Sequence, residues 1–439
     1  MTSTVSALNL ESLERRFLEV RRFTERIVEP LSPEDCMVQS MDDVSPTRWH
    51  LAHTTWFFET FALNGEPGYR PFDDSYHYLF NSYYNTLGKQ FPRSQRGTIS
   101  RPGLSEIQDY RRHVDESITK RLESPEYAAR FNSILQIGLQ HEQQHQELML
   151  TDIKHVFACN PVFPVYREDN FDHTTTTSRD STEINSGNYD IGHTGDNFAY
   201  DNESPRHKVY LCDCSVDGNL VTCGEYLEFM ADGGYKNPEF WLSLGWNTVQ
   251  QQNWSAPLYW TQRDGQWMQF TLAGLTPIHP DWPVCHVSLF EADAYARWAG
   301  KRLPTEFEWE VAATKTAATK LAETNRDAEP FADYFMDNAL AIHPTRSSSS
   351  MMGGVWEWTG SSYLAYPGYR PPEGALGEYN GKFMCNQYVL RGGSVATHSS
   401  HIRPTYRNFF PPDARWQFTG IRLAEDWHHG TTLREYKHA

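Results

Sequence analysis

A long periodic segment, from Ser124 to about Val156, predicts a single helix that carries two histidines on its buried face. Ser124 is a typical N-cap residue, and a proline follows it at the first helical position. Apolar residues then recur at helical spacing, at Phe131, Ile134, Leu135, Leu148, Met149, Ile153 and Val156. His141 and His145 fall on the same face, about 40° apart around the helix axis. Two such imidazoles form either half of a metal site or a hydrogen-bonded pair of core histidines.

The length and charge of the chain limit the classes of protein it can belong to. Its 439 residues are enough for two or three domains, and its net charge of −17 argues against a nucleic-acid partner. No run approaches the roughly 18 apolar residues of a membrane span, and the N-terminus lacks the pattern of a signal peptide. Seven cysteines without a CxxC pair are typical of a reducing compartment. We therefore expect a cytoplasmic protein without a membrane partner.

The first 160 residues contain four segments with helical periodicity and predict a four-helix bundle. The other three helices are expected over residues 8–29, from Ser45-Pro46 onward, and over about 103–122. The second of these can hold His53 among tryptophans on its inner face. His50 lies about 60° the other way, so either histidine could face inward. Bundle cores commonly hold metals between facing helices.

The composition changes after Asn160. Residues 161–187 contain prolines, a threonine run and several Asp and Ser, which predicts an irregular linker between domains. Residues 188–428 consist of short apolar runs broken by Gly, Pro, Asn and Asp, and we expect a loop-rich second domain there. Its predicted helices cover Thr222 to Ala231, Leu289 to Ala299 and a segment that follows Thr305. Residues 429–439 are expected to form a C-terminal tail.

Three histidines, His53, His141 and His145, form the main candidate site, for iron or zinc. Imidazole suits several transition metals, and three protein ligands leave coordination positions open, as catalytic sites do. Glu147 lies about 200° around the helix from His145, so we expect it behind the ligands or at the helix surface. The same segment reads His-Glu-x-x-His, the zinc metallopeptidase motif in which Glu142 would be the general base. No metzincin continuation follows, although a distant third ligand would also satisfy that motif.

Two further clusters have both a structural and a functional interpretation. Adjacent aromatic residues in the segment 403–412 form either a loop with buried rings or part of a cage for a quaternary ammonium. Tyr83 and Tyr84 precede Arg93 and Arg96 by about ten residues in the sequence. Such tyrosines usually pack and such arginines are usually solvated. If they face the metal, a tyrosine could supply a proton and an arginine could bind a carboxylate.

Together these motifs resemble the ergothioneine-pathway sulfoxide synthases, also called hercynine oxygenases. The N-terminal half resembles their DinB-like bundle through residues 49–54 and the run from His141 to Glu147. The C-terminal half resembles their formylglycine-generating-enzyme-type, C-type-lectin-like domain, through residues 198–207, 302–310, 354–359, 390–394 and 403–424. Gly354 stands where the family more often has Asn. Formylglycine-generating enzymes use a cysteine pair near the C-terminus, but the last cysteine here is Cys385, so sulfatase activation is not expected.

The resemblance implies an α+β multidomain fold, with a DinB-like four-helix bundle at 1–160 and a mixed α/β domain at 188–428. It also implies an Fe(II)- and O2-dependent enzyme that joins the sulfur of cysteine or γ-glutamylcysteine to the imidazole ring of hercynine, the trimethylated betaine of histidine, as a sulfoxide. The implied iron ligands are His53, His141 and His145. The implied hercynine-binding residues are Gln144, Asn408, Phe409 and Phe410.

The sulfur donor is the least determined part of this prediction. Arg93 and Arg96 are implied to bind its carboxylate. Tyr83 and Tyr84 resemble tyrosines near the iron in the cysteine-using branch, and Tyr84 is our first choice for the proton or electron donor. Related enzymes that use selenium donors or unmethylated histidine stay open, as do two alternatives of another class: a zinc metallopeptidase and a non-catalytic ligand-binding module.

Overall fold

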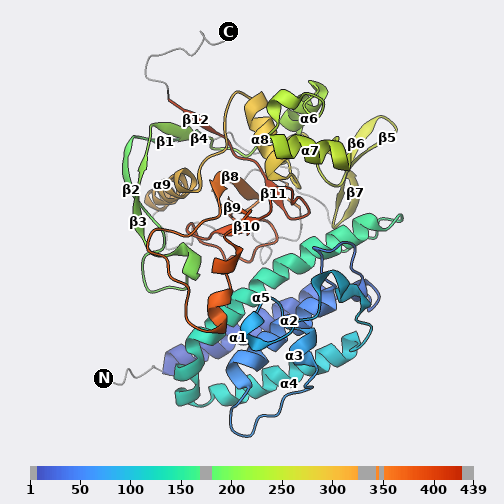
Figure 1. The fold of residues 1–439 in the computed structure, drawn as a ribbon, viewed down its shortest axis with the longest axis vertical. Coiled ribbons are helices and arrows are strands. Elements are labelled where there is room, and N and C mark those ends of the chain that lie inside the picture. The colour runs from blue at the N-terminus through green and yellow to red at the C-terminus, as the bar shows by residue number, and fades with distance from the viewer. Residues whose placement is uncertain (1–6, 169–179, 325–342, 346–350, 428–439) are drawn as a thin grey trace.

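The computed structural model describes residues 7–168, 180–324, 343–345 and 351–427. Within them, a helical N-terminal half packs against a mixed C-terminal half, and one long helix, α5, lies between the other helices and the second half (Figure 1). This confirms the predicted α+β multidomain architecture. No helix in the described part of the chain combines the length and apolar character that a membrane span requires.

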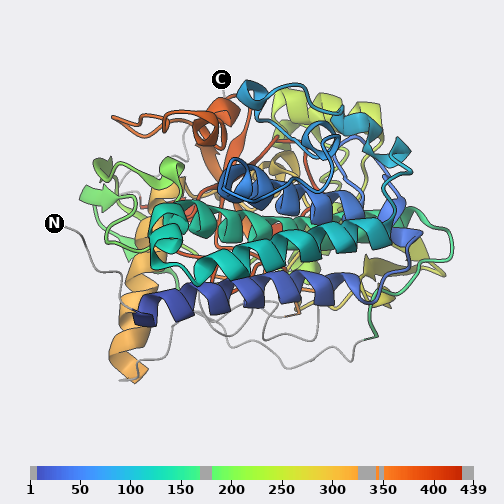
Figure 2. The same ribbon diagram turned by 90° about the horizontal axis from the view of Figure 1, so that it is seen from below.

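The bundle consists of four long helices that run alongside one another (Figure 2). They are α1 (Ala7–Val28), α2 (Thr47–Phe58), α4 (Leu104–Leu122) and α5 (Pro125–Cys159). The short helix α3 (Tyr76–Leu79) and several 3-10 turns, among them Asn85–Leu87 and Arg93–Thr98, lie in the connection between α2 and α4. This connection returns to α2, where the carbonyl of Phe80 bonds to His53.

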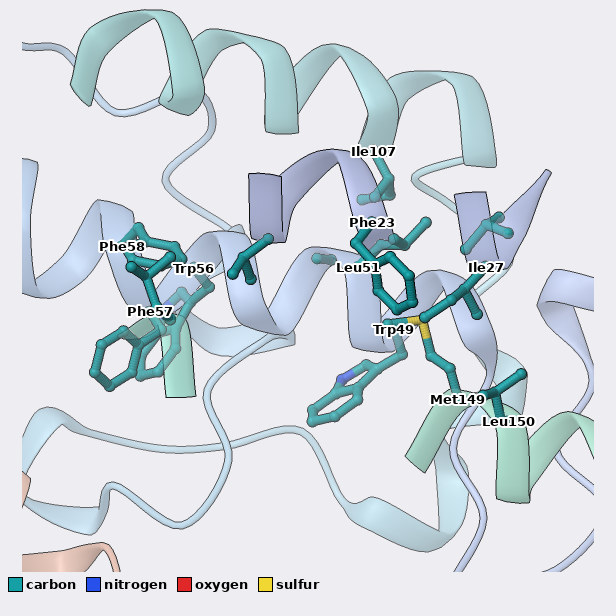
Figure 3. Packing of buried hydrophobic residues seen from close by; sticks show 14 of the residues in the cluster. Phe23, Ile27, Trp49, Leu51, Trp56, Phe57, Phe58, Ile107, Met149 and Leu150 are labelled. Atoms are coloured by element: carbon teal, nitrogen blue, oxygen red, sulfur yellow. The ribbon is translucent and has the colours of Figure 1, made fainter. Parts of the chain in front are cut away.

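The α5 helix forms for the reasons that its sequence suggests. Ser124 is the N-cap and its hydroxyl accepts a hydrogen bond from the Tyr127 N–H, while Pro125 occupies the first turn. The helix continues three residues beyond the predicted end, to Cys159. At Gly138 an added Cβ would overlap the Phe58 ring, so glycine allows α5 and α2 to approach closely. Figure 3 shows part of the apolar packing among these helices, with side chains that include Phe23, Ile27, Trp49, Leu51, Ile107 and Met149.

The second half is built from short strands in four small sheets, as far as the described residues show. One sheet has the order β10 (Asn408–Phe410), β9 (Tyr388–Arg391), β8 (Trp356–Ser362) and β11 (Thr419–Gly420). A second has the order β1 (Thr182–Ile184), β4 (Cys214–Val216) and β12 (Ala424–Asp426). The third pairs β2 (Gly187–Ile191) with β3 (His207–Leu211), and the fourth contains β5 (Trp260–Arg263), β6 (Gln266–Thr271) and β7 (Gly274–Pro277). Only β11 and β8 pair in parallel among these strands.

Helices α6 (Cys223–Ala231), α8 (Leu289–Trp298) and α9 (Glu306–Thr324) occupy the three positions predicted for this half. Helix α7 (Ser243–Gln252) was not predicted, because only Gly245 and Val249 of its residues are buried and no clear apolar stripe results. The strand β1 and the first residue of β2 lie inside the range expected for the linker. The domain limits themselves stay a prediction, and the expected tail, 429–439, lies outside the described residues.

The sequence segments that carry the family resemblance meet in the interior of this half as buried ion pairs. Arg407 donates two hydrogen bonds to Glu306, and Arg391 donates to Glu306 and Glu310. Arg422 binds the carboxylate of Glu357 through two nitrogens, at 2.7 Å each. Breaking one partner of such a pair leaves an uncompensated buried charge, which costs about 3–5 kcal/mol. These ion pairs therefore hold together the segments that surround the site.

Candidate active site

Three buried histidines from two helices converge in the bundle. His53 of α2 and His141 and His145 of α5 each offer one nitrogen, and these atoms lie within 4.8 Å of one another. The ring centroids are 4.9 Å apart for His53 and His141, 4.8 Å for His53 and His145, and 4.6 Å for His141 and His145. The cluster predicted from helical spacing is thus present, with one turn of α5 facing one residue of α2.

The chemistry of the three imidazoles fits a metal ion. His53 Nδ1 lies 2.6 Å from the carbonyl oxygen of Phe80, which can only accept, so its proton sits there and Nε2 keeps a lone pair. His141 Nδ1 is buried and has no hydrogen-bond partner in the described structure. Burial and neighbouring histidines lower the pKa of His53 and His145 well below the usual range, and burial lowers the pKa of His141 to about 3. All three are therefore neutral bases at pH 7, as metal ligands must be.

A cavity of about 450 Å³ opens in front of this cluster and is lined by residues of both halves. Every residue predicted to bind the iron or a substrate lies on its wall, as do both candidate tyrosines. From the bundle these are Tyr83, Tyr84, Arg93, Arg96, Gln144 and the three histidines, and from the second half Asn408, Phe409 and Phe410. Such a volume is within the range of small-molecule sites. The arrangement brings the predicted set together around one space.

The two arginines differ in their surroundings. Arg96 is buried, its guanidinium lies 3.4 Å from the Trp49 ring centroid, and it donates to the hydroxyls of Ser45 and Ser82 at 2.9 and 2.8 Å. It has no ion-pair partner among the described residues, and burial lowers its pKa to about 9. A buried cation without a counter-charge favours an anionic ligand. Arg93 is more exposed and donates to the Tyr83 hydroxyl at 2.6 Å.

The paired tyrosines also point to different environments. Tyr83 has a left-handed backbone with φ of 69°, is 39% exposed and packs edge-on against Phe383. Tyr84 is buried, and its ring lies 5.6 Å from that of Trp56. Its hydroxyl has no hydrogen-bond partner among the described residues, and burial raises its pKa. Tyr84 is therefore a neutral phenol on the cavity wall.

A third tyrosine, Tyr379, was not predicted from the sequence. Its ring lies edge-on to His141 at 5.7 Å, and its hydroxyl donates to the side-chain oxygen of Gln144. The Gln144 amide nitrogen in turn donates to the Tyr406 hydroxyl at 2.5 Å. Tyr379 follows the 3-10 turn Ala375–Glu378 in an irregular stretch, so no periodic pattern marks it in the sequence.

Phe409 and Phe410 are consecutive residues of β10, and successive side chains of a strand point to opposite faces. Phe409 stacks on Tyr363 with centroids 4.1 Å apart, whereas Phe410 lies edge-on to Trp416 at 5.6 Å. Both nevertheless line the cavity. The side-chain oxygen of Asn408 accepts from the Phe409 N–H at 2.9 Å.

The two glutamates of the motif are outside the histidine cluster, and each accepts hydrogen bonds from other side chains. Glu142 is buried between α1, α4 and α5, where it accepts hydrogen bonds from Arg21, Arg111 and Thr24. Burial alone would raise its pKa, but the two arginines hold the pKa at about 2. It does not line the cavity, so the geometry does not support a metallopeptidase with Glu142 as its general base.

Of the two positions expected for Glu147, the helix surface is excluded, because its side chain is buried. It is buried and accepts hydrogen bonds from Trp356 Nε1 at 2.8 Å, Ser394 Oγ at 2.6 Å and Thr397 Oγ1 at 2.7 Å. All three donors belong to the second half of the chain. Glu147 therefore joins the helix that carries two of the histidines to the domain that completes the cavity.

Comparisons with known proteins agree with this division. A profile described as the DinB superfamily matches residues 16–149, and one described as a sulfatase-modifying factor enzyme 1-like domain matches residues 167–427. A protein named hercynine oxygenase from Mycolicibacterium thermoresistibile is 30% identical over 446 residues, covering 94% of each chain. Its namesake from Mycobacterium tuberculosis is 30% identical and covers 95% of this chain and 99% of its own. The formylglycine-generating enzyme of Streptomyces coelicolor is 27% identical over 57% of this chain and 90% of its own.

Proposed function

We propose, since the chain belongs to the hercynine oxygenase family, that it is an Fe(II)- and O2-dependent sulfoxide synthase that acts on hercynine and a thiol. The observation that carries the proposal is the cluster of three neutral histidines at a cavity that also contains a buried, unpaired arginine. The reaction balances with O2 as the only oxidant. The ring C–H and the thiol S–H each lose a hydrogen, the C–S bond forms, one oxygen atom ends on sulfur, and the other leaves as water.

The metal would be held by His53, His141 and His145, and Fe(II) would supply the O2 chemistry that no side chain can provide. The protein's own contribution is to orient these imidazoles and to keep them unprotonated by burial. The seven cysteines are all free, in keeping with the reducing cytoplasm that we propose as its location.

The sulfur donor would bind through its carboxylate at Arg96, assisted by Arg93. Arg96 has the stronger claim, because its charge is buried and lacks an acidic partner. The adjacent tyrosines, Tyr83 and Tyr84, favour free cysteine over γ-glutamylcysteine through their resemblance to the cysteine-using branch. Comparing kcat/KM for the two thiols tests this choice. A strong preference for the dipeptide would reverse it without affecting the proposed metal ligands.

Hercynine would lie between Gln144 and β10, with Asn408 near its polar groups and Phe409 and Phe410 near its trimethylammonium. The side-chain oxygen and nitrogen of Gln144 are held by two tyrosine hydroxyls, so its orientation is fixed before substrate arrives. Aromatic faces attract a quaternary ammonium. Selection of hercynine over histidine would therefore depend on these rings.

The proton donor would be Tyr84, whose hydroxyl is buried at the cavity wall without a partner. Tyr379 is a second candidate, because its ring is in edge contact with that of His141. Separate Tyr84→Phe and Tyr379→Phe variants distinguish them. We expect the donor's loss to lower sulfoxide formation while hercynine binding is retained, and the other substitution to spare kcat.

One experiment separates the three classes of function. The protein is purified without oxygen, loaded with Fe(II), and O2 consumption and product mass are measured with hercynine plus cysteine. Formation of the sulfoxide supports the proposal. Tightly bound zinc with peptide hydrolysis would favour the metallopeptidase, and hercynine binding without O2 consumption would favour a non-catalytic module.

A further inference from the structure

His50 is buried and precedes His53 by three residues. It is not one of the three clustered histidines, but it contacts one of them, His145. Its Nδ1 lies 2.7 Å from Nδ1 of His145, and its Nε2 lies 3.0 Å from Oδ2 of Asp152. All three side chains are buried. They form a continuous row from a carboxylate on α5, through α2, back to the second α5 histidine.

The partners of His50 determine where the protons in this row must sit. The Asp152 carboxylate only accepts, so His50 Nε2 carries a proton and donates it. With a single ring proton placed on Nε2, the other nitrogen of His50, Nδ1, is an acceptor. The short contact between the two Nδ1 atoms is a hydrogen bond only if His145 Nδ1 carries the proton. His145 Nε2 is left with its lone pair.

The three clustered histidines differ in what determines which ring nitrogen carries the proton. His53 is fixed by the backbone carbonyl of Phe80, which no side-chain substitution removes. His141 Nδ1 has no partner among the described residues. Among the described residues, His145 is therefore the member of the cluster whose tautomer depends on other side chains.

Asp152 is itself held in place. Its Oδ2 also accepts a hydrogen bond from the Ser45 backbone N–H at 2.8 Å, just before α2 begins. The Ser45 hydroxyl accepts from Arg96 at 2.9 Å. Besides His50, the carboxylate thus has a backbone donor at a fixed position, so His50 bonds to an anchored group.

We propose that Asp152 and His50 are positioning residues that hold His145 in the Nδ1–H tautomer with Nε2 directed at the metal. The proposal rests on the metal site of the proposed function. Partners that orient a ligating imidazole typically change metal affinity by about 10–100-fold when they are lost. A histidine that only fills space would not show this effect.

The test uses the full chain without metal and Co(II) alone as the probe. His50→Leu keeps apolar volume but removes both hydrogen bonds, and we expect Co(II) affinity, measured by competition with a chelator, to fall about 10–100-fold. His50→Gln can still accept and donate, so it should recover part of the loss. His155→Leu is the matched control, because His155 lies on α5 and bonds to Ser40 rather than to a ligand. It should leave affinity within about twofold of the unaltered protein.

A second measurement reads the tautomer directly and does not depend on activity or on metal. In ring-15N-labelled, metal-free protein, the nitrogen shifts of His145, assigned by their loss in His145→Gln, report which nitrogen carries the proton. We expect Nδ1–H in the unaltered protein and a change in His50→Leu. If His50→Leu bound Co(II) as tightly as the unaltered protein, the positioning role of His50 and Asp152 would be wrong. A proton on His145 Nε2 in the unaltered protein would also contradict that role. Neither result would affect the proposed metal ligands. If the unaltered protein bound no Co(II), the proposed metal function would fail, and the ring shifts would still decide the tautomer.

Discussion

The three clustered histidines are held in their orientations by different contacts, and these contacts determine the expected effect of each substitution. His53 and His145 are oriented by hydrogen bonds to Phe80 and His50, whereas His141 is held by packing against Phe57 and Tyr379. The angular positions of His50 and His53 around the helix axis, taken from the sequence, left open which of the two faces inward. The ambiguity has a physical cause: every residue from Thr47 to Phe58 is buried, so α2 has no solvent face that would distinguish them.

Removal of any proposed ligand should abolish metal binding. With His53→Ala, His141→Ala or His145→Ala, two imidazoles remain, too few to hold the ion against solvent. We expect no stoichiometric Fe(II) and no sulfoxide formation, as measured by metal analysis and product mass. His113→Ala is the control, since His113 bonds to the Arg70 carbonyl at the bundle surface. Retention of stoichiometric iron in any one ligand variant would remove that histidine from the set.

The aromatic residues of β10 should determine selection of the cation. Replacing Phe409 or Phe410 with Leu keeps apolar volume but removes the ring face, whose attraction for a cation amounts to about 0.5–2 kcal/mol. A loss of 1.4 kcal/mol is about tenfold in binding. We therefore expect the apparent KM for hercynine to rise several-fold to tens-fold, and discrimination against histidine to shrink in parallel.

Iron content and the KM for the thiol are the internal controls for these two variants, and neither should change. Phe409 stacks on Tyr363, so its substitution also needs a check of the unfolding midpoint. If both variants kept full discrimination between hercynine and histidine, the rings would be packing residues and the ammonium would bind elsewhere.

Helices α1, α4 and α5 could be predicted from the sequence because each presents a repeating apolar stripe beside an exposed face. Ser124 and Pro125 mark α5, and the spacing of His141 and His145 places both on its inner side. The residues that complete the site from the second half could not be predicted in this way. Tyr379 lies in an irregular stretch, and only the tertiary fold brings it to His141. Its position depends on contacts between segments more than 200 residues apart, as in the Gln144–Tyr379 bond.

The buried ion-pair group at Glu142 should make the bundle sensitive to acid. The folded-state pKa of this carboxyl, about 2, is below its ordinary value of 4.5, so its stabilising effect is complete above that value. The effect is lost as the pH falls from about 4.5 toward 2. Glu142→Gln leaves Arg21 and Arg111 without their shared counter-charge and should cost about 3–5 kcal/mol of the free energy of unfolding at pH 7.

Urea unfolding of the parent and Glu142→Gln proteins between pH 7 and pH 3 measures this difference. The difference in free energy of unfolding between the two proteins should narrow steadily below about pH 4.5. At that pH the carboxylate of Glu142 in the parent protein begins to be protonated. Glu126→Gln is a suitable control, since Glu126 is an exposed acidic residue in the first turn of α5. A difference that stays constant with pH would show that the substitution acts through shape rather than through charge.

The whole molecule depends on the contact between the bundle and the second domain, because the ligands come from one and much of the cavity wall from the other. Arg391, Arg407 and Arg422 keep the second domain rigid from within. Glu147 then ties it to α5, one turn from the cavity-lining Gln144. This explains why metal ligands and substrate-binding residues lie on separate halves of the sequence yet face one space.

Glu147 offers the sharpest test of that coupling. Glu147→Leu leaves Trp356 Nε1 and the hydroxyls of Ser394 and Thr397 without their acceptor, and each buried donor left unpaired costs about 1–3 kcal/mol. Glu147→Gln keeps the shape and one acceptor oxygen, so it should cost less. We expect Glu147→Leu to lower the unfolding midpoint and to weaken hercynine and thiol binding, with Co(II) affinity retained within about tenfold because all three histidines lie in the bundle. Calorimetry and titration of the two variants measure these effects separately. If Leu and Gln acted alike, or if Co(II) binding failed before substrate binding, Glu147 would serve the metal ligands rather than the junction between the domains.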